Sequence, residues 1–426
     1  MIDIKLILTQ PEKVKELLAR KGCDADLGRI AALDERRRSL IVRGDELKKQ
    51  RNDASAQVPA LKKQGKDVSD IIARTKAIGA EIADIDKEIS AVEKELTDAV
   101  SVLPNLPDED LEGGGKENNK VLKVFGEKPE FAFSPLDHVA LCAKHGLIDY
   151  ERGVKLSGSG HWIYRGKGAV LEWALLNFFV SEHLADGYEF ILPPLALGYN
   201  CGYGSGQFPK FRDEVYWVEN PDAGGDRTKM KFMLPTAETA LVNLYAGEVM
   251  KESELPKKLF AYTPCFRKEA GSYRSEERGM IRGHQFNKVE MVQITAADKS
   301  DEAFEELVGK ACSLVEKLGL HFRLSKLAAG DCSASMARTY DIEVWIPSMG
   351  IYKEVSSVSN ARDYQARRNS TRYKGADGKN RFVHTLNGSG LATSRVLPAI
   401  VEQYQQADGS IVVPEALRKY TGFDVI

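Results

Sequence analysis

The chain has no excess of either charge. Sixty Lys and Arg residues stand against 62 Asp and Glu residues, which gives a formal net charge of -2 over 426 residues. A globally basic surface for nucleic acid is therefore not indicated, and any such contact must come from local patches. The six cysteines are scattered, with no CxxC pair and no nearby His at ligand spacing. This pattern indicates neither a disulfide framework nor a zinc site, and we expect a reducing, cytoplasmic setting.

Long apolar runs are also missing. No stretch approaches the ~18 consecutive apolar residues that a membrane-spanning helix needs. The first residues lack the basic segment and long apolar stretch of a secretion signal. We therefore expect a soluble protein that does not associate with a membrane. The length predicts a substantial core and two domains.

The N-terminal quarter has the pattern of long helices. Residues 1–10 predict a short strand or turn, and Pro11 opens a helix that ends at Gly22. Leu33, Leu40 and Leu47 then recur every seven residues, and a similar apolar seam follows a break over 58–66. We predict two antiparallel helices over about 27–103. Each has one narrow apolar seam, as in a two-stranded coiled coil that projects into solvent.

The first of these helices is basic. Its cations, with those of the tip, are Arg29, Arg36, Arg37, Arg38, Arg43, Lys48, Lys49, Arg51, Lys62, Lys63 and Lys66. A basic rod can contact a phosphate backbone without reading bases. A solvated coiled-coil face that serves as a spacer or dimer seam is the alternative interpretation. Pro104 and Pro107 stop the second helix, and the acidic, glycine-rich stretch after them predicts a linker.

From about Val121 the pattern becomes mixed α and β. Strands are expected at 188–192, 215–218, 231–234, 260–263, 285–294, 321–324, 339–346 and 352–357. Helices are expected at 169–186, 236–244, 301–318 and 390–406. Strands in runs, without regular crossover helices, predict an α+β fold in which helices flank an antiparallel sheet.

Residues 265–291 predict two strands joined by a charged loop. The charged side chains are Arg267, Lys268, Glu269, Arg274, Arg278 and Arg282. Arginine at this density suits bidentate binding of carboxylate or phosphate oxygens. An ordinary solvated hairpin loop is the alternative.

Three further clusters carry polar side chains. Residues 234–238 offer a hydroxyl and a carboxylate at a helix start, which is also a common capping pattern. Residues 352–360 offer an acid and hydroxyls that could hold Mg²⁺ with phosphate oxygens, or form a Ser-rich strand end. Residues 386–395 predict a glycine-flanked turn running into a helix that carries Arg395, although most such turns are simply turns.

In this order the clusters resemble the class II aminoacyl-tRNA synthetases, and among them the bacterial-type seryl-tRNA synthetases. The resemblance covers nearly the whole chain. Motif one resembles the helix before Gly187 with the strand up to Pro193 and Pro194. Motif two corresponds to 265–291 and motif three to 387–395. The segments similar to seryl enzymes in particular are 206–211, 236–238, 285–291 and 354–360.

The resemblance implies an N-terminal tRNA-binding domain over 1–107 with its helical arm at about 27–103. A linker over 108–120 and a class II catalytic domain over 121–426 follow. It implies ATP-dependent ligation of L-serine to tRNA(Ser) through a seryl-adenylate, and serylation of tRNA(Sec) where that tRNA is present. The implied partners and cofactors are ATP, Mg²⁺ and a second copy of the chain through motif one, with no zinc.

The resemblance also assigns roles to single residues. Arg267 and Arg395 are the expected catalytic residues, and Arg267 bridges the α-phosphate and the serine carboxylate. The expected ATP-binding residues are Arg267, Glu269, Arg282, Phe286, Glu354, Ser357 and Arg395. Among these, Glu269 recognises the adenine amino group, Phe286 stacks on adenine, and Arg282 and Arg395 hold the tail phosphates. Glu354 and Ser357 are the expected Mg²⁺ ligands.

Serine is expected to bind through Thr236, Glu238, Arg267, Glu290 and Ser389. Thr236 and Glu238 receive the ammonium, and Glu290 with Ser389 accepts the hydroxyl. A buried acceptor of this kind rejects alanine because its oxygens would stay unpaired.

Some segments depart from the family. Residues from Arg274 to Glu277 replace a usual Gly-Arg-Asp-Thr, which puts the contacts to the tRNA acceptor end in doubt. Ser394 stands where a Gly commonly precedes the motif-three arginine, and 159–162 replace a common arginine. Residues 220–229 form a surface insertion. These features are typical of a divergent member, such as a second copy in its organism, that keeps its activity.

Two other functions compete with this interpretation. An amino-acid:carrier-protein ligase resembles the catalytic body, but it lacks the arm and uses zinc with Cys and His. A non-catalytic paralogue keeps the fold without the chemistry. Arg267, Glu269, Glu354, Ser357 and Arg395 are all present, which argues against the second alternative.

Overall fold

The computed structural model describes residues 1–269 and 279–426. Two compact units make up the chain. The N-terminal unit contains residues 2–18 and 23–103, and the body contains Met1, 19–22 and 104–426. The predicted departure from Arg274 to Glu277 lies outside the described residues, as does Arg278.

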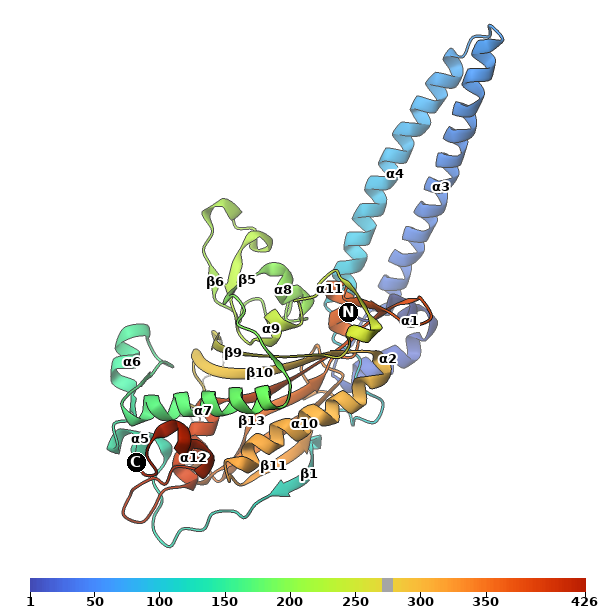
Figure 1. The fold of residues 1–426 in the computed structure, drawn as a ribbon. Helices are drawn as coiled ribbons and strands as arrows, with labels where there is room; N and C mark the ends of the chain where they lie inside the picture. The colour runs from blue at the N-terminus through green and yellow to red at the C-terminus, as the bar shows by residue number, and fades with distance from the viewer. Residues whose placement is uncertain (270–278) are drawn as a thin grey trace. The chain divides into compact units, whose positions relative to one another are not determined.

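The N-terminal unit is built of helices. Its elements are α1 (Ile4–Thr9), α2 (Pro11–Arg20), α3 (Leu27–Lys63) and α4 (Ser69–Ser101). Helices α3 and α4 run side by side (Figure 1), and their seam buries Ile30, Leu33, Ile78, Ile82, Ile85, Val92 and Leu96. Exposed ion pairs link the two helices, with 2.6 Å between Arg36 and Glu88 and 2.6 Å between Arg43 and Glu81. The predicted pair of long helices is confirmed.

Two local predictions in this unit were wrong. Residues 4–9 form a helix and not a strand or turn, because the carboxylate of Asp3 accepts a hydrogen bond from the Lys5 amide at 2.9 Å and caps it. Helix α3 also continues through Pro59 and does not break near Val58. A proline near a helix end removes one backbone donor, and the carbonyl of exposed Ser55 can bond to water instead.

A large sheet organises the body. Within the described residues eight strands pair in the order β1-β11-β12-β13-β16-β10-β9-β4. Their bounds are β1 Lys120–Phe125, β4 Glu189–Phe190, β9 Lys257–Phe266, β10 Gln285–Thr295, β11 Phe322–Lys326, β12 Arg338–Ile346, β13 Ile351–Asn360 and β16 His384–Ala392. Neighbours pair antiparallel except β4 with β9. The predicted antiparallel sheet is confirmed.

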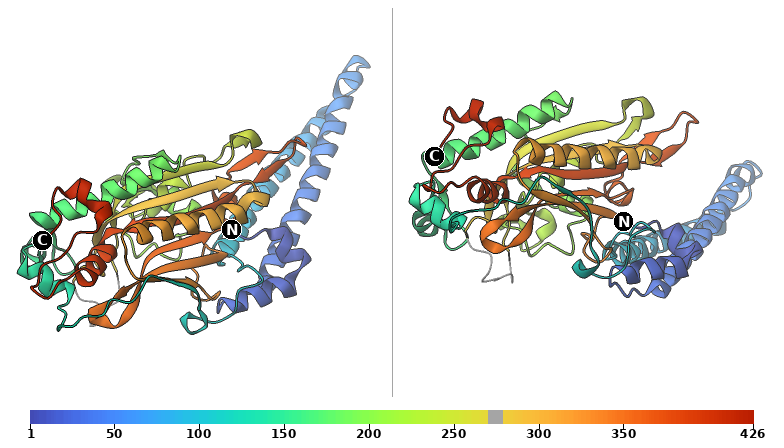
Figure 2. Two further views of the ribbon diagram at one scale, coloured as in Figure 1. Left: turned by 60° about the horizontal axis from the view of Figure 1, so that its bottom comes forward. Right: turned by 90° about the horizontal axis from the view of Figure 1, so that it is seen from below.

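Three long helices cover the sheet. They are α7 (Lys167–Ala185), α10 (Ser300–Lys317) and α12 (Thr393–Gln403), and α7 and α10 run along the strands (Figure 2). The core between helices and sheet includes Phe179, Phe260, Phe304, Phe322 and Val396, each at most 2% exposed. Burial of such side chains stabilises the body by roughly 1.5–3 kcal/mol each.

Shorter elements complete the body. The helices are α5 His138–Lys144, α6 Tyr150–Ser157, α8 Tyr199–Gly204, α9 Glu238–Leu241, α11 Tyr364–Asn369 and α13 Glu415–Thr421. The short strands are β2 Ile148–Asp149, β3 Ile163–Tyr164, β5 Ala196–Gly198, β6 Trp217–Val218, β7 Lys231–Met233, β8 Val249–Lys251, β14 Arg372–Lys374 and β15 Asn380–Phe382. The 3₁₀ turns lie at Lys116–Asn118, Pro221–Ala223, Arg227–Lys229, Glu252–Glu254, Ala297–Lys299 and Pro347–Met349. In the described part of the chain no helix is long and apolar enough to cross a membrane.

Helix α12 begins later than predicted. Residues 387–392 are the end of strand β16 and not a turn, and α12 starts at Thr393. A Cβ on Gly390 would lie 2.3 Å from Nε2 of His183. The glycine therefore permits a close approach to α7 within a strand. The helix expected at 236–244 is likewise shorter, since α9 has four residues.

The stretch after the N-terminal unit is bound to the sheet. Asp108 accepts hydrogen bonds from Arg338 Nε at 2.8 Å and from Arg362 at 2.7 Å. The amide of Asn105 donates to the carbonyl oxygens of Ser335 and Ala361. These contacts belong to the body and fix residues 104–108 on it.

Candidate active site

The predicted site residues lie on neighbouring elements of the body. Strands β13, β16, β10 and β9 are consecutive in the sheet, and they carry or adjoin most of these residues. Glu290 on β10 is paired in register with Ser389 on β16. The sheet therefore brings together side chains that are about 100 residues apart in sequence.

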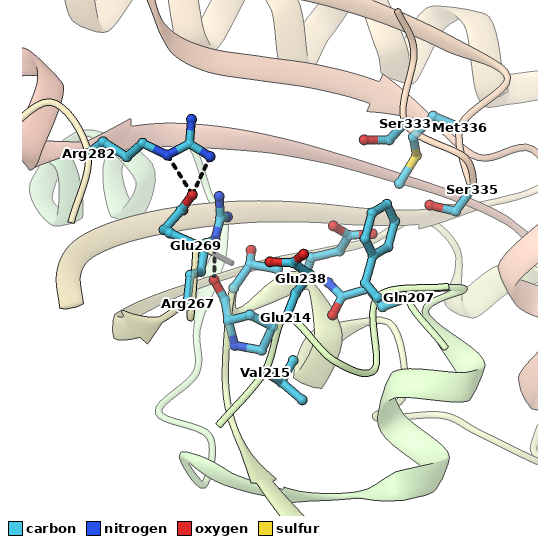
Figure 3. A pocket seen from close by; sticks show the side chains of 13 residues that line it. Gln207, Glu214, Val215, Glu238, Arg267, Glu269, Arg282, Ser333, Ser335 and Met336 are labelled. Atoms are coloured by element: carbon cyan, nitrogen blue, oxygen red, sulfur yellow. Dashed lines mark hydrogen bonds and ion pairs between the residues drawn. The ribbon is translucent and has the colours of Figure 1, made fainter. Parts of the chain in front are cut away.

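Three cavities are lined by residues of this part of the sheet and its neighbouring segments. One, of about 370 Å³, is lined by Thr236, Glu238, Arg267, Glu269 and Arg282, with Gln207, Phe211, Glu214, Val215, Pro235, Ser333, Ser335 and Met336 (Figure 3). A second, of about 110 Å³, shares three of these residues and adds Phe286, Lys288, Glu354, Ser389 and Arg395. A third, of about 740 Å³, includes Glu354, Ser357 and Arg395. All the predicted site residues except Glu290 line at least one of the three.

Glu290 contacts two residues that line the second cavity, Lys288 and Ser389. Its side chain is 1% exposed. It accepts hydrogen bonds from Asn387 Nδ2 at 3.0 Å and from the Ser389 hydroxyl at 3.3 Å. The ammonium of Lys288 forms an ion pair with it. The carboxylate is thus surrounded by donors, as a buried charge requires.

A second buried acid, Glu238, lies at the start of α9. It accepts a hydrogen bond from Gln365 Nε2 at 2.7 Å, and the amide of Gln365 is held by the Ser205 carbonyl and the Thr385 hydroxyl. Burial, with the charge of Glu290, raises the pKa of Glu238 to about 7. The group can therefore change charge near neutral pH.

Two arginines and an aromatic ring lie at the junction of the first two cavities. Arg267 Nε donates to the carbonyl of Pro235 at 3.2 Å, and its guanidinium lies 5.1 Å from the ring centre of Phe286. Arg282 Nε donates to Glu269 Oε2 at 2.7 Å (Figure 3). Both guanidiniums are therefore oriented by the protein before any ligand binds.

The third cavity contains the predicted metal ligands. Arg395 donates to the Glu354 carbonyl at 2.8 Å and lies 3.4 Å from its carboxylate. The hydroxyl of Ser357 donates to Asp341 Oδ1 at 2.7 Å. Burial and the charge of Glu354 raise the pKa of Asp341. Burial opposes ionisation of Glu354 too, yet the charge of Arg395, the hydrogen bond from Ser357 and the charges of Arg267 and Lys288 together lower its pKa.

These oxygens fit the chemistry of magnesium. An ionised carboxylate and a hydroxyl are hard ligands, and proteins often hold Mg²⁺ with one or two carboxylates plus substrate phosphates. No group of three or more His, Cys, Asp or Glu side chains that could hold a metal occurs in residues 1–269 and 279–426. Further ligands would therefore have to come from elsewhere, such as phosphate oxygens.

Four residues without an assigned role also belong to the site. They are Lys288, Asp341, Gln365 and Asn387. Lys288 and Asn387 lie inside segments that the sequence analysis had assigned to the family motifs. Lys288 is two residues before Glu290, and because side chains alternate along a strand, the two lie on the same face. No local pattern assigns a role to Asp341 or Gln365, because their contacts are with other segments of the chain.

Two of the departures from the family, at 159–162 and at Ser394, lie near these cavities. His161 stacks on His284 with 5.2 Å between ring centres, and His284 Nδ1 lies 3.0 Å from the Arg267 carbonyl oxygen. Ser394 is buried and lines the second cavity. The insertion at 220–229 forms two 3₁₀ turns tied to the body by an ion pair between Arg227 and Asp213.

Two family models match the chain. Residues 1–107 match the seryl-tRNA synthetase N-terminal domain. Residues 216–404 match the tRNA synthetase class II core domain (G, H, P, S and T). The first match contains the long helix pair and the second contains all the predicted site residues.

Similar proteins extend over the full length. A protein named serine--tRNA ligase 2 from Clostridium acetobutylicum is 58% identical over 100% of both chains. A serine--tRNA ligase from Thermotoga petrophila is 47% identical, also over 100% of both. The solved structure of seryl-tRNA synthetase from Pyrococcus horikoshii complexed with ATP has a TM-score of 0.91 at 30% identity and covers 100% of this chain and 99% of that one.

A further solved structure agrees. The cytoplasmic serine-tRNA ligase from Naegleria fowleri in complex with AMP has a TM-score of 0.87 at 26% identity, and the match covers 100% of this chain and 98% of that one. Domain models, relatives and folds agree along the whole chain. The chain belongs to the seryl-tRNA synthetase family of the class II aminoacyl-tRNA synthetases.

Proposed function

We propose that the chain ligates L-serine to tRNA(Ser) in two steps at the cavities described above, with the residue roles that follow. The observation that carries the proposal is the buried carboxylate of Glu290, framed by Ser389 and Asn387. Oδ1 of Asn387 is buried and has no hydrogen-bond partner among the described residues. A bound ligand with a hydrogen-bond donor would supply the partner that this acceptor beside Glu290 lacks.

In the first step the serine carboxylate attacks the α-phosphate of ATP and pyrophosphate leaves. Such a reaction needs charge neutralisation and in-line positioning more than a general base. Arg267 lines both the first and second cavities, so its guanidinium can bind the serine carboxylate and the α-phosphate together. Arg395, which lines the second and third cavities, neutralises the tail phosphates with Arg282.

The adenine site is the second cavity and its rim. Phe286 supplies a flat apolar face on which adenine stacks. Glu269 accepts the adenine amino group while its ion pair with Arg282 fixes the orientation of the carboxylate. Glu354 and Ser357 hold Mg²⁺ when it is bound, and the ion supplies further neutralisation of phosphate charge.

Serine binds at the first cavity beside Glu290. Thr236 and Glu238 receive its ammonium, and Glu290 with Ser389 receives its hydroxyl. Alanine is rejected because it leaves the buried acceptors without a donor.

In the second step the seryl group passes to the terminal ribose hydroxyl of tRNA. We assign residues 1–107 to tRNA binding, with the arm at about 27–103 as the phosphate-contacting element. Residues 108–120 are then the connection and 121–426 the catalytic domain. The same chemistry extends to tRNA(Sec) where it is present, and a tRNA substrate places the enzyme in the cytoplasm.

We also propose a homodimer through motif one. Large apolar side chains are exposed along α6, α7 and the segment after them: Val154, Leu156, Val170, Trp173, Leu184, Phe190 and Leu192. Apolar patches of this kind typically mark a protein interface. A second copy of the chain is the partner that the family predicts.

The decisive test is ATP–pyrophosphate exchange with each amino acid, followed by charging of total tRNA. Exchange that depends on serine, with charging of serine-accepting tRNA, is expected. If no amino acid, or an amino acid other than serine, supports exchange, the proposal fails. Exchange without charging of any tRNA would favour a ligase with another acceptor.

A further inference from the structure

Lys288 is a buried cation of the serine site to which no role has been assigned. It lies on β10, two residues before Glu290, and is 6% exposed. Its ammonium donates a hydrogen bond to the Thr236 hydroxyl at 2.7 Å and forms an ion pair with Glu290. Both of these partners are proposed to receive serine.

Lys288 supplies the counter-charge that touches the buried carboxylate of Glu290. Asn387 and Ser389 also contact Glu290, but both are neutral. Glu238 brings a further acid close to Glu290. Arg267 lies nearby, yet its guanidinium stacks on Phe286. Among residues 1–269 and 279–426, Lys288 is therefore the cation in direct contact with the buried carboxylate.

A carboxylate without its counter-charge does not stay ionised in a buried site. It takes up a proton, because burial penalises the charged form. An ionised carboxylate only accepts hydrogen bonds, whereas a carboxylic acid also donates one. Recognition of a hydroxyl against a methyl group requires an acceptor that stays unpaired when the hydroxyl is missing.

We propose that Lys288 is a specificity-determining residue, which keeps Glu290 an acceptor-only carboxylate and so sets the preference for serine over alanine. The inference rests on the proposed function and adds a residue to its serine site. Lys288 acts through Glu290 and Thr236. It also fixes the Thr236 hydroxyl, because one lone pair of that oxygen is occupied by the ammonium.

The test compares Lys288→Met with Lys288→Arg in ATP–pyrophosphate exchange. Methionine is unbranched and fills a similar space without charge, and arginine keeps the charge. For Lys288→Met, the ratio of kcat/KM for serine to that for alanine should fall by about tenfold or more, and KM for serine should rise. KM for ATP should change much less. Lys288→Arg should recover most of the ratio.

A matched control is Lys258→Met. Lys258 lies on neighbouring strand β9 and forms an ion pair with Glu306 at 2.8 Å, outside the cavities. This variant should keep the wild-type ratio. Thermal melting of each variant separates misfolding from altered selection, since a protein that merely folds less well loses serine and alanine activity together.

A second variant covers the case in which Lys288→Met does not fold. The pair Lys288→Met with Glu290→Gln removes both charges of the ion pair, leaves neither partner as an unpaired buried charge and should show the same low ratio. A wild-type ratio in Lys288→Met or in the double variant would overturn the inference. So would a proportional loss for serine and ATP, or a failure of Lys288→Arg to recover. Absence of serine-dependent exchange in the wild-type protein would instead contradict the proposed function.

Discussion

Gln365 donates a hydrogen bond to Glu238, which lines the first cavity, with 2.7 Å between Nε2 of Gln365 and Oε1 of Glu238. The two residues are 127 positions apart. The bond favours the ionised form of the carboxyl group, while burial and the charge of Glu290 oppose it. The balance leaves the pKa of Glu238 at about 7, close to neutral pH.

Serine binding should therefore depend on pH. Below pH 7 Glu238 carries a proton and cannot attract an ammonium, and above pH 7 it is ionised. We expect KM for serine in the exchange reaction to fall as the pH rises from 6 to 8, with its midpoint near the pKa of Glu238. Gln365→Leu removes a bond to the ionised form, so the midpoint should move to higher pH. A KM for serine that is flat across this range would contradict the role of Glu238.

Glu290→Ala tests the serine hydroxyl site. Without the acceptor, kcat/KM for serine should fall by at least about a hundredfold, while KM for ATP stays within a few fold. Steady-state exchange with each substrate varied in turn provides the measurement. Unchanged serine dependence would remove Glu290 from the pocket.

Glu172 gives a prediction about stability. This residue of α7 is buried and accepts hydrogen bonds from Asn287 Nδ2 at 2.8 Å and from the Thr393 hydroxyl at 2.6 Å. Burial raises its pKa to about 7. The folded protein thus holds this proton more tightly than the unfolded chain, and the stabilising contribution is lost as the pH rises from about 4.5 through 7.

Glu172→Gln keeps the accepting oxygen and removes the titration. Relative to the wild type, the free energy of unfolding of this variant should increase by about 1 kcal/mol between pH 6 and pH 8. Urea denaturation at the two pH values measures it. Glu305→Gln, at an exposed position of α10, should behave like the wild type at both, and an equal response of the two variants would refute the assignment.

The tip of the arm provides a test of RNA binding. Lys62, Lys63 and Lys66 are exposed there, and replacing all three with Ala should raise KM for tRNA while leaving exchange unchanged. The dependence of tRNA affinity on salt should weaken by up to about one unit of slope for each lost phosphate contact. Lys87→Ala with Lys94→Ala, on α4, is the matched control. Equal loss of exchange and charging would contradict the proposal that the arm binds tRNA while the body alone forms the adenylate.

The sequence predicted the helix pair and the antiparallel sheet well, because heptad spacing and alternation are local patterns. It could not predict which strands pair. Strand β10 lies between β9 and β16, and β1 adds to the edge at β11, and no local period specifies such contacts. The wrong prediction at 387–392 has the same origin. Glycine in a sequence usually indicates a turn, and only the structure shows that Gly390 is needed for the close approach to His183.

In the site, too, the sequence predicted what local motifs specify but not the contacts between distant residues. Motif residues such as Arg267 and Glu354 were identified by type and order. Lys288 and Thr236 are in contact although they are 52 residues apart in the sequence. The hydrogen bond between Ser357 and Asp341 joins the adjacent strands β13 and β12. Both depend on register and loop position, which are set by packing throughout the body.

Successive side chains of strand β10 lie alternately in the core and in the proposed serine site. Val289 and Met291 are fully buried in the core, and their neighbours Lys288 and Glu290 belong to the serine site. Substitutions at the second pair change what the enzyme accepts without altering how helices pack on the sheet. A duplicated copy of such a gene can therefore drift in substrate preference by single mutations while the protein it encodes continues to fold.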